Sequence, residues 1–190
     1  MPTPSNNRIL IDLDMTLVLP KWLPPYAVRK GFVQVRTIPA KYNGRGEPYV
    51  LVVAVRPSAL PFLDAAAELG DLGIITYGPQ HAQAEILKAV NLHGRFKNVW
   101  SRDKHEQIRE PADWPVVVVD DHSLAGDQSD DRRVQTKLSW LGIEPDLFDD
   151  HFVQCARWEQ NDVSFDPEPL TALLPTIAAK LERQHRRRIF

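Results

Sequence analysis

The stretch RILIDLDMT, at residues 8–16, joins a short apolar run to two aspartates. Runs of this kind, rich in β-branched residues, are typical of strands buried on both faces of a parallel sheet. Asp12 and Asp14 follow the run, at the point where the chain would leave the sheet. Open α/β sheets bind their ligands at the carboxyl ends of the strands, so these two carboxylates are the first candidates for a functional site.

Four further segments have the composition of strands. The clearest are residues 72–76 and 116–120, and residues 96–100 and 152–155 are weaker versions. Helical patterns lie over residues 57–69, 80–90, 128–141 and 171–183. Strands that alternate with helices through short connections predict right-handed crossovers. The expected fold is therefore a doubly wound α/β fold, with a mainly parallel sheet and helices on both faces.

Residues 17–56 interrupt this alternation, because they are too long for an ordinary loop between a strand and a helix. Within them, residues 32–36 and 49–55 have strand composition and flank the turn-forming residues 43–46. We expect an inserted β-hairpin that forms a flap over the site; the alternative is an edge hairpin of the main sheet. A chain of 190 residues with 43% hydrophobic residues fits a single domain, residues 1–190, that contains this insertion.

The composition narrows the classes of function. The formal net charge is −2, so no overall field draws the protein to nucleic acid or to an anionic membrane. Cys155 is the single cysteine, which excludes an internal disulfide and a multi-thiolate metal site. No stretch approaches the roughly 20 apolar residues of a membrane span, and the first residues lack the apolar run of a signal peptide. These features predict a cytoplasmic protein.

Two acidic pairs follow predicted strands. Asp12 and Asp14 end the first strand, and Asp120 and Asp121 end the run at 116–120. If the carboxyl ends of these strands meet, the two pairs repel each other unless a cation lies between them. Oxygen ligands of this kind favour Mg²⁺, whereas a zinc site would need a His or Cys cluster that the sequence lacks.

A metal ion, carboxylates and a lysine are what phosphoryl transfer requires. Asp12 is suited to attack phosphorus and to form an aspartyl-phosphate. Asp14, two residues later, can protonate the leaving oxygen and then take a proton from water. Thr76 and Lys104, near the ends of two other strands, are the candidates for holding the phosphoryl oxygens.

These residues resemble the motifs of the haloacid dehalogenase superfamily of phosphatases. Residues 12–17 are similar to the first motif, DxDx(T/V) at the end of the first strand. Thr76 resembles the second motif, Lys104 the third, and Asp120 with Asp121 the fourth. The order of the motifs along the chain is the same.

Within the superfamily, the sequence is most similar to the RNA polymerase II C-terminal-domain phosphatases and their NLI-interacting-factor-like relatives. Residues 56–63 resemble that group's Arg-Pro-Gly entry to its first long helix, which follows a hairpin. The spacing from Lys104 to Asp120 is also similar, as are residues 152–155 and the terminal helix after them.

The resemblance implies Mg²⁺ bound by the Asp12 carboxylate, the Asp14 backbone carbonyl and Asp120, with phosphate held by Thr76 and Lys104. The sequence departs from the group at Met15, where glutamate is frequent, and at residues 120–123, where Asp-Asn-Ser-Pro is usual. Further candidates are Asp121 as a metal ligand, Thr16 for phosphate binding, and Arg56, Tyr77 and His122 as substrate contacts.

Two other classes of function remain open. A receiver-like phosphoacceptor module would also combine acidic residues, Mg²⁺, Thr and Lys, although receivers carry the acidic pair first and a single acceptor Asp later. A nucleic-acid-binding protein or polynucleotide-end phosphatase is suggested by the basic residues 186–188 and by the aromatic residues of the insertion. The substrate could be a phosphoprotein, a nucleotide, an oligonucleotide end or a metabolite.

Overall fold

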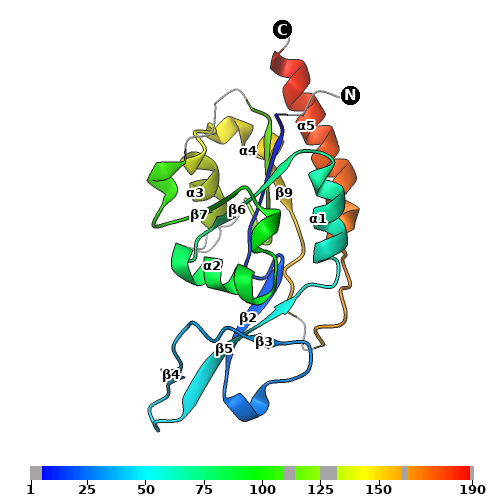
Figure 1. Cartoon of the computed structure of the whole chain (residues 1–190). Helices are drawn as coiled ribbons and strands as arrows, with labels where there is room; N and C mark the ends of the chain where they lie inside the picture. The colour runs from blue at the N-terminus through cyan, green and yellow to red at the C-terminus, as the bar shows by residue number, and fades with distance from the viewer. Residues whose placement is uncertain (1–5, 109–113, 125–131, 160–161, 189–190) are drawn as a thin grey trace.

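The computed structural model describes residues 6–108, 114–124, 132–159 and 162–188. A five-stranded sheet with the order β7-β6-β1-β8-β9 lies at its centre, and all of its neighbouring strands are parallel (Figure 1). The doubly wound α/β fold predicted from the sequence is confirmed. The strands are β1 (Arg8–Ile11), β6 (Asp71–Thr76), β7 (Asn98–Ser101), β8 (Val116–Asp120) and β9 (Phe152–Gln154).

Helices cover both faces of this sheet, because successive side chains of a strand point to opposite sides. In β1, Ile9 and Ile11 pack against α1, α2 and α5, whereas Leu10 packs against α3 on the other face. The α-helices are α1 (Ala59–Ala67), α2 (Gln80–Ala89), α3 (Arg132–Trp140), α4 (Phe148–His151) and α5 (Leu174–Arg188). Residues 128–131 of the predicted third helix lie outside the described residues. Short 3₁₀ helices are η1 (Pro25–Ala27), η2 (His93–Arg95), η3 (His105–Gln107), η4 (Pro145–Leu147) and η5 (Leu170–Leu173).

The insertion forms a separate antiparallel sheet and is not an edge of the main one. Its longest strand, β5 (Pro48–Val55), pairs with β2 (Val18–Leu23), β3 (Val33–Gln34) and β4 (Lys41–Tyr42). Strand β2 was not predicted from the sequence, since Pro20 and Lys21 break its strand pattern. Proline is tolerated there because β2 is an edge strand. The small sheet lies at the end of the molecule opposite the two termini (Figure 1), beyond the carboxyl end of β1.

The predicted turn between β4 and β5 is present and is organised by Asn43. The side-chain carbonyl of Asn43 accepts hydrogen bonds from the backbone N–H groups of Arg45 (2.9 Å) and Glu47 (3.0 Å). Gly46 has a φ of 76°, a conformation that favours glycine. Turn residues therefore set the register in which Lys41 lies opposite Tyr49.

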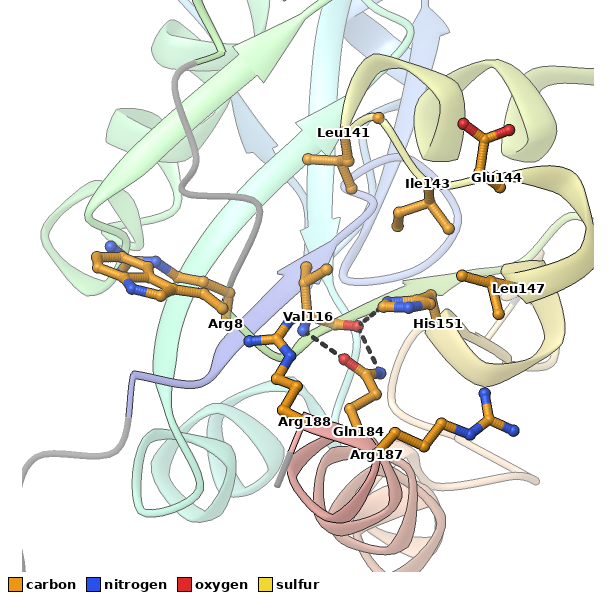
Figure 2. A pocket seen from close by; sticks show the side chains of 12 residues that line it. Arg8, Val116, Leu141, Ile143, Glu144, Leu147, His151, Gln184, Arg187 and Arg188 are labelled. Carbon is orange, nitrogen blue, oxygen red and sulfur yellow. Dashed lines mark hydrogen bonds between the residues drawn. The ribbon is translucent and has the colours of Figure 1, made fainter. Parts of the chain in front are cut away.

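A hollow of about 260 Å³ lies at the amino ends of β1 and β8, and Figure 2 shows the residues that line it. Gln184 of α5 accepts a hydrogen bond from the N–H of Val116 (2.9 Å) and donates one to its carbonyl (3.0 Å). The His151 Nδ1 also bonds this carbonyl, at 2.8 Å. These contacts attach α4 and α5 to the start of β8. Within the described residues, no helix is long and apolar enough to cross a membrane.

Candidate active site

The carboxyl ends of three neighbouring strands bring the predicted acidic and hydroxyl residues together. Asp12 follows β1 directly, and Thr76 and Asp120 are the last residues of β6 and β8, the two strands that flank β1. The backbone N–H of Asp12 donates to the Val119 carbonyl at 2.8 Å, which extends the hydrogen bonding between β1 and β8 up to the aspartate. Asp12 and Asp120 are 4% and 0% exposed. Both carboxylates are therefore buried at the same edge of the sheet.

A tight turn after β1 returns the chain toward this edge. The N–H groups of Leu17 and Val18 both bond the Leu13 carbonyl, at 3.0 and 3.1 Å. Met15, inside the turn, has a φ of 63°, which is unusual for a residue with a side chain. Its carbonyl accepts a hydrogen bond from the Trp158 N–H at 2.8 Å, so a distant segment supports this conformation. The turn places Asp14 beside Asp12 at the cavity.

The cation between the acids is Lys137, a residue that the sequence analysis did not select. Its Nζ lies 2.6 Å from Asp12 Oδ1 and 2.6 Å from Asp120 Oδ2. Lys137 comes from α3 and is 1% exposed. Lys104, the predicted phosphate-binding lysine, is instead an exposed residue of the turn after β7 and is not among the residues that line the cavity. The structure does not bring Lys104 to the site.

A sequence signal for Lys137 did exist. Val134, Lys137, Leu138 and Leu141 follow the spacing i, i+3, i+4 and i+7, which is the apolar face of a helix. A lysine on such a face is rarely buried without a partner of opposite charge. The motif resemblance favoured Lys104, because it comes before Asp120 at the familiar spacing, and the position of Lys137 in the apolar pattern was overlooked.

The three charges shift one another's pKa values. Burial raises the pKa of Asp12, Lys137 lowers it, and the neighbouring charge of Asp120 raises it again. Burial alone would also raise the pKa of Asp120, but the charge of Lys137 and the hydrogen bonds from His122 and Lys137 lower it below its usual range. Burial would lower the pKa of Lys137, yet the two carboxylates raise it, so the amino group stays protonated. One ammonium group thus contacts both carboxylates at the same distance, 2.6 Å.

Asp14 has a different environment. Burial raises its pKa, and a hydrogen bond of 3.0 Å from Gln83 Nε2 to Asp14 Oδ2 opposes this shift. The other oxygen, Oδ1, is buried without a hydrogen-bond partner among the described residues. A carboxyl group with a raised pKa can act as a general acid near neutral pH.

Asp121 is held by residues on both sides. Thr16 Oγ1 donates to Asp121 Oδ1 at 3.3 Å, and the His122 Nδ1 lies 3.3 Å from the same oxygen. Thr16 is 0% exposed and does not line the cavity, so the structure does not place its hydroxyl where it could bind phosphate. The His122 Nδ1 also bonds Asp120 Oδ1 at 2.9 Å. Hydrogen bonds that its ring donates to these two carboxylates raise the pKa of His122 to about 10.

The residues present fit a magnesium ion. Asp14 Oδ1 and Asp121 Oδ2 are buried oxygens without a hydrogen-bond partner in the described part of the chain. Asp120, Asp121 and His122 each offer a ligand atom within 4.8 Å of the others. Asp120 and Asp121 supply carboxylate oxygens, which are the ligands that Mg²⁺ prefers.

A cavity of about 360 Å³ opens over these groups. Asp12, Asp14, Thr76 and Lys137 line it, and so do the predicted substrate-contact residues Tyr77 and His122. The Thr76 side chain is 1% exposed and accepts a hydrogen bond from the Gly78 N–H at 3.3 Å.

Arg56, the other predicted substrate contact, serves the structure of the protein instead. Its Nε and Asp166 Oδ2 are 3.0 Å apart, and the two side chains are 1% and 4% exposed. Its Nη1 and Nη2 donate to the carbonyls of Ala156 (2.9 Å) and Glu168 (2.7 Å). Burial would raise the pKa of Asp166, but hydrogen bonds from Arg56 and Ser58 lower it. The guanidinium ties the insertion to the segment before α5 and is not available to a substrate.

Comparisons with known proteins place the chain in a family and show proteins of similar fold. Residues 8–123, more than half of the chain, match the family model of the NLI interacting factor-like phosphatases. Among curated protein sequences, none matches significantly.

Similar solved structures include the essential RNA polymerase II CTD phosphatase Fcp1, at 18% identity and a TM-score of 0.50 over 95% of this chain and 49% of that one. A fission yeast Fcp1 variant bound to beryllium fluoride has 19% identity and a TM-score of 0.49, over 93% and 51%. A haloacid dehalogenase-like family hydrolase from Xanthomonas campestris has 12% identity and a TM-score of 0.50, over 97% and 100%. The chain spans about half the length of the two Fcp1 chains.

The parallel sheet has the haloacid dehalogenase-like fold that the motifs predicted, with Asp12 and Asp120 at the carboxyl ends of β1 and β8. The chain belongs to the family of NLI interacting factor-like phosphatases.

Proposed function

We propose that this protein hydrolyses phosphomonoesters with the help of Mg²⁺, through an aspartyl-phosphate on Asp12. The observation that carries the proposal is the convergence of Asp12 and Asp120 on one ammonium group, at the base of a cavity that Asp14 and Thr76 also line. Such a site can balance the negative charge of a phosphoryl group during its transfer and can hold a nucleophile next to the phosphorus atom.

In the first step, an Asp12 carboxylate oxygen attacks phosphorus while the bond from phosphorus to the leaving oxygen breaks. Asp14, whose pKa is raised by burial, gives its proton to the leaving oxygen. In the second step, Asp14 takes a proton from water, the water oxygen attacks phosphorus, and the bond to Asp12 breaks. Inorganic phosphate leaves and Asp14 is again protonated.

The other residues prepare the site for these steps. Lys137 keeps positive charge at the nucleophile and lies where it can also attract phosphoryl oxygens. The Thr76 hydroxyl, at the end of β6, can donate to the phosphoryl group. Asp12 and Asp120, with Asp121, would hold Mg²⁺, which would neutralise charge on the phosphoryl oxygens and favour the ionised form of Asp12.

The test is hydrolysis of p-nitrophenyl phosphate with Mg²⁺ and with EDTA. Wild-type protein should turn over only with Mg²⁺, and Asp12→Asn should lose activity by at least about a thousandfold. Asp149→Asn removes an exposed carboxylate outside the site and is the matched control, with unchanged activity expected. After an acid quench, wild-type protein should carry a phosphoryl group that hydroxylamine releases.

Undiminished activity of Asp12→Asn would disprove its role as nucleophile. A stable phosphorylated protein without turnover would instead favour the receiver-like alternative, in which the phosphoryl group is stored and not hydrolysed.

A further inference from the structure

Three arginines line the same cavity as the catalytic aspartates, and each comes from a different part of the fold. Arg102 follows β7, Arg133 belongs to α3, and Arg157 follows β9. Segments that are far apart in the sequence thus bring guanidinium groups to one mouth. A guanidinium group is suited to two-point binding of a carboxylate or a phosphate.

The buried acids of the site have cationic partners of their own. Lys137 lies between Asp12 and Asp120, and His122 contacts Asp120 and Asp121. Mg²⁺ would supply the remaining positive charge.

Arg157 is directed to local acids, because its Nε lies 2.6 Å from Glu159 and 3.8 Å from Asp121. The carboxylate beside Arg102, Asp103, accepts hydrogen bonds from the Ser101 hydroxyl and the Gln80 N–H. Arg102 and Arg133 place two further guanidinium groups on the lining of the cavity.

An aromatic stack fixes the wall on which Arg133 lies. The Tyr77 ring stacks on Trp140 with 5.6 Å between centroids, and Trp140 stacks on His105 at 5.0 Å. The Arg133 guanidinium carbon lies 5.5 Å from the centre of the Tyr77 ring, within the range of a cation–π contact. Tyr77 comes directly after Thr76, so this wall begins next to the phosphoryl-binding position.

We propose that the preferred substrate is a phosphomonoester whose leaving group carries a second anionic group, a carboxylate or another phosphate, bound by Arg102 and Arg133. This inference rests on the proposed function, because it assigns the leaving group of the same reaction. The transferred phosphoryl group lies over Asp12, and the second anion lies at the mouth. An uncharged leaving group makes no such contact and is bound less strongly.

Paired substrates that differ in the second anion test this inference. Glycerol 3-phosphate is compared with 3-phosphoglycerate for a carboxylate, and adenosine 5′-monophosphate with adenosine 3′,5′-bisphosphate for a phosphate. In at least one pair, wild-type kcat/KM should be about tenfold higher for the substrate with the extra anion, which is about 1.4 kcal/mol. The pair that shows the larger ratio identifies the kind of anion. Added KCl should reduce the ratio, since Arg102 is exposed and its charge is screened by salt.

Substitutions then assign the contact. The double variant Arg102→Gln with Arg133→Gln should lower the ratio to near one. Arg186→Gln, on an exposed arginine of α5 at the far end of the sheet, should keep the wild-type ratio. Melting temperatures of both variants show whether the fold is intact, and the salt dependence of the wild-type ratio needs no variant.

Equal kcat/KM for both members of each pair, with p-nitrophenyl phosphate still hydrolysed, would overturn this inference and leave the proposed function standing. A ratio that survives in a folded double variant would overturn the role of the two arginines. If wild-type protein hydrolyses none of the substrates, p-nitrophenyl phosphate included, the proposed function itself is wrong.

Discussion

Replacing Lys137 by methionine removes the ammonium group at the centre of the site while keeping a side chain of similar length. The substitution breaks two contacts of 2.6 Å, one to Asp12 and one to Asp120. The two carboxylates are 4% and 0% exposed, so solvent replaces the lost partner only poorly. Lys104→Met is the matched control, because it removes the same charge from an exposed turn.

The structure sets the expected size of both effects. Removing one partner of a buried ion pair costs about 3–5 kcal/mol, since the other charge is left without compensation. Lys104→Met, at the surface, should change the free energy of unfolding by less than about 0.5 kcal/mol. Loss of a positive group that stabilises a reacting centre typically lowers kcat by about 10²–10³-fold. Without Lys137, the pKa of Asp12 should rise further, which adds to the loss of its nucleophilic form.

Urea unfolding and the kcat for p-nitrophenyl phosphate measure the two effects. Lys137→Met should be less stable and nearly inactive, and added Mg²⁺ should restore part of the stability because a divalent ion also compensates the carboxylates. Lys104→Met should match the wild-type protein in both assays. The opposite result, an inactive Lys104→Met and a Lys137→Met within about twofold of wild type, would show that the spacing from Lys104 to Asp120 identifies the catalytic lysine and that our assignment is wrong.

Two further substitutions test other parts of the structure. Gln83→Leu removes the hydrogen bond that lowers the pKa of Asp14, so the alkaline limb of the kcat profile, where the general acid loses its proton, should move to higher pH; an unmoved limb would separate Gln83 from proton transfer. Asp166→Asn breaks the buried pair with Arg56 and should cost about 3–5 kcal/mol in urea unfolding, while the exposed Asp162→Asn should change little. Because the folded pKa of Asp166 lies below its unfolded value, its ionised form stabilises the protein above the unfolded pKa of about 3.9, and this stabilisation is lost as pH falls through the folded pKa. Equal stability of the two Asn variants at neutral pH would contradict the assigned pair.

The sequence predicted the main sheet well, because strands that are buried on both faces have a recognisable local run of apolar residues. Each strand of a covered parallel sheet is a short apolar run, and the runs that contain Ile11, Ile75 and Val118 were recognised as strands. The small sheet was predicted less well. Its edge strand β2 contains Pro20 and Lys21, and only its pairing with β5 makes it a strand.

The residues of the candidate site likewise differ in how well a local sequence pattern predicted them. Asp12, Asp14, Thr76 and Asp120 were found because each stands at or just beyond the end of an apolar run, which is visible without the fold. Lys137 was missed because its partner Asp12 lies 125 residues away in the sequence, and no local sequence pattern indicates that the two residues are in contact.

The sequence by itself determined the order along the chain of the main-sheet strands and of the helices between them, since hydrophobic periodicity is a local property. It also placed the aspartates at the carboxyl edge of that sheet, because strand ends are visible in the sequence. Only the tertiary structure decided which cations reach that edge. Lys137 enters the site from α3, Lys104 stays outside it, and Arg56 turns to Asp166, 110 residues away. The physical reason is that a charged side chain is stable in the interior only beside a group of opposite charge. Which groups meet depends on how segments distant in the sequence pack together.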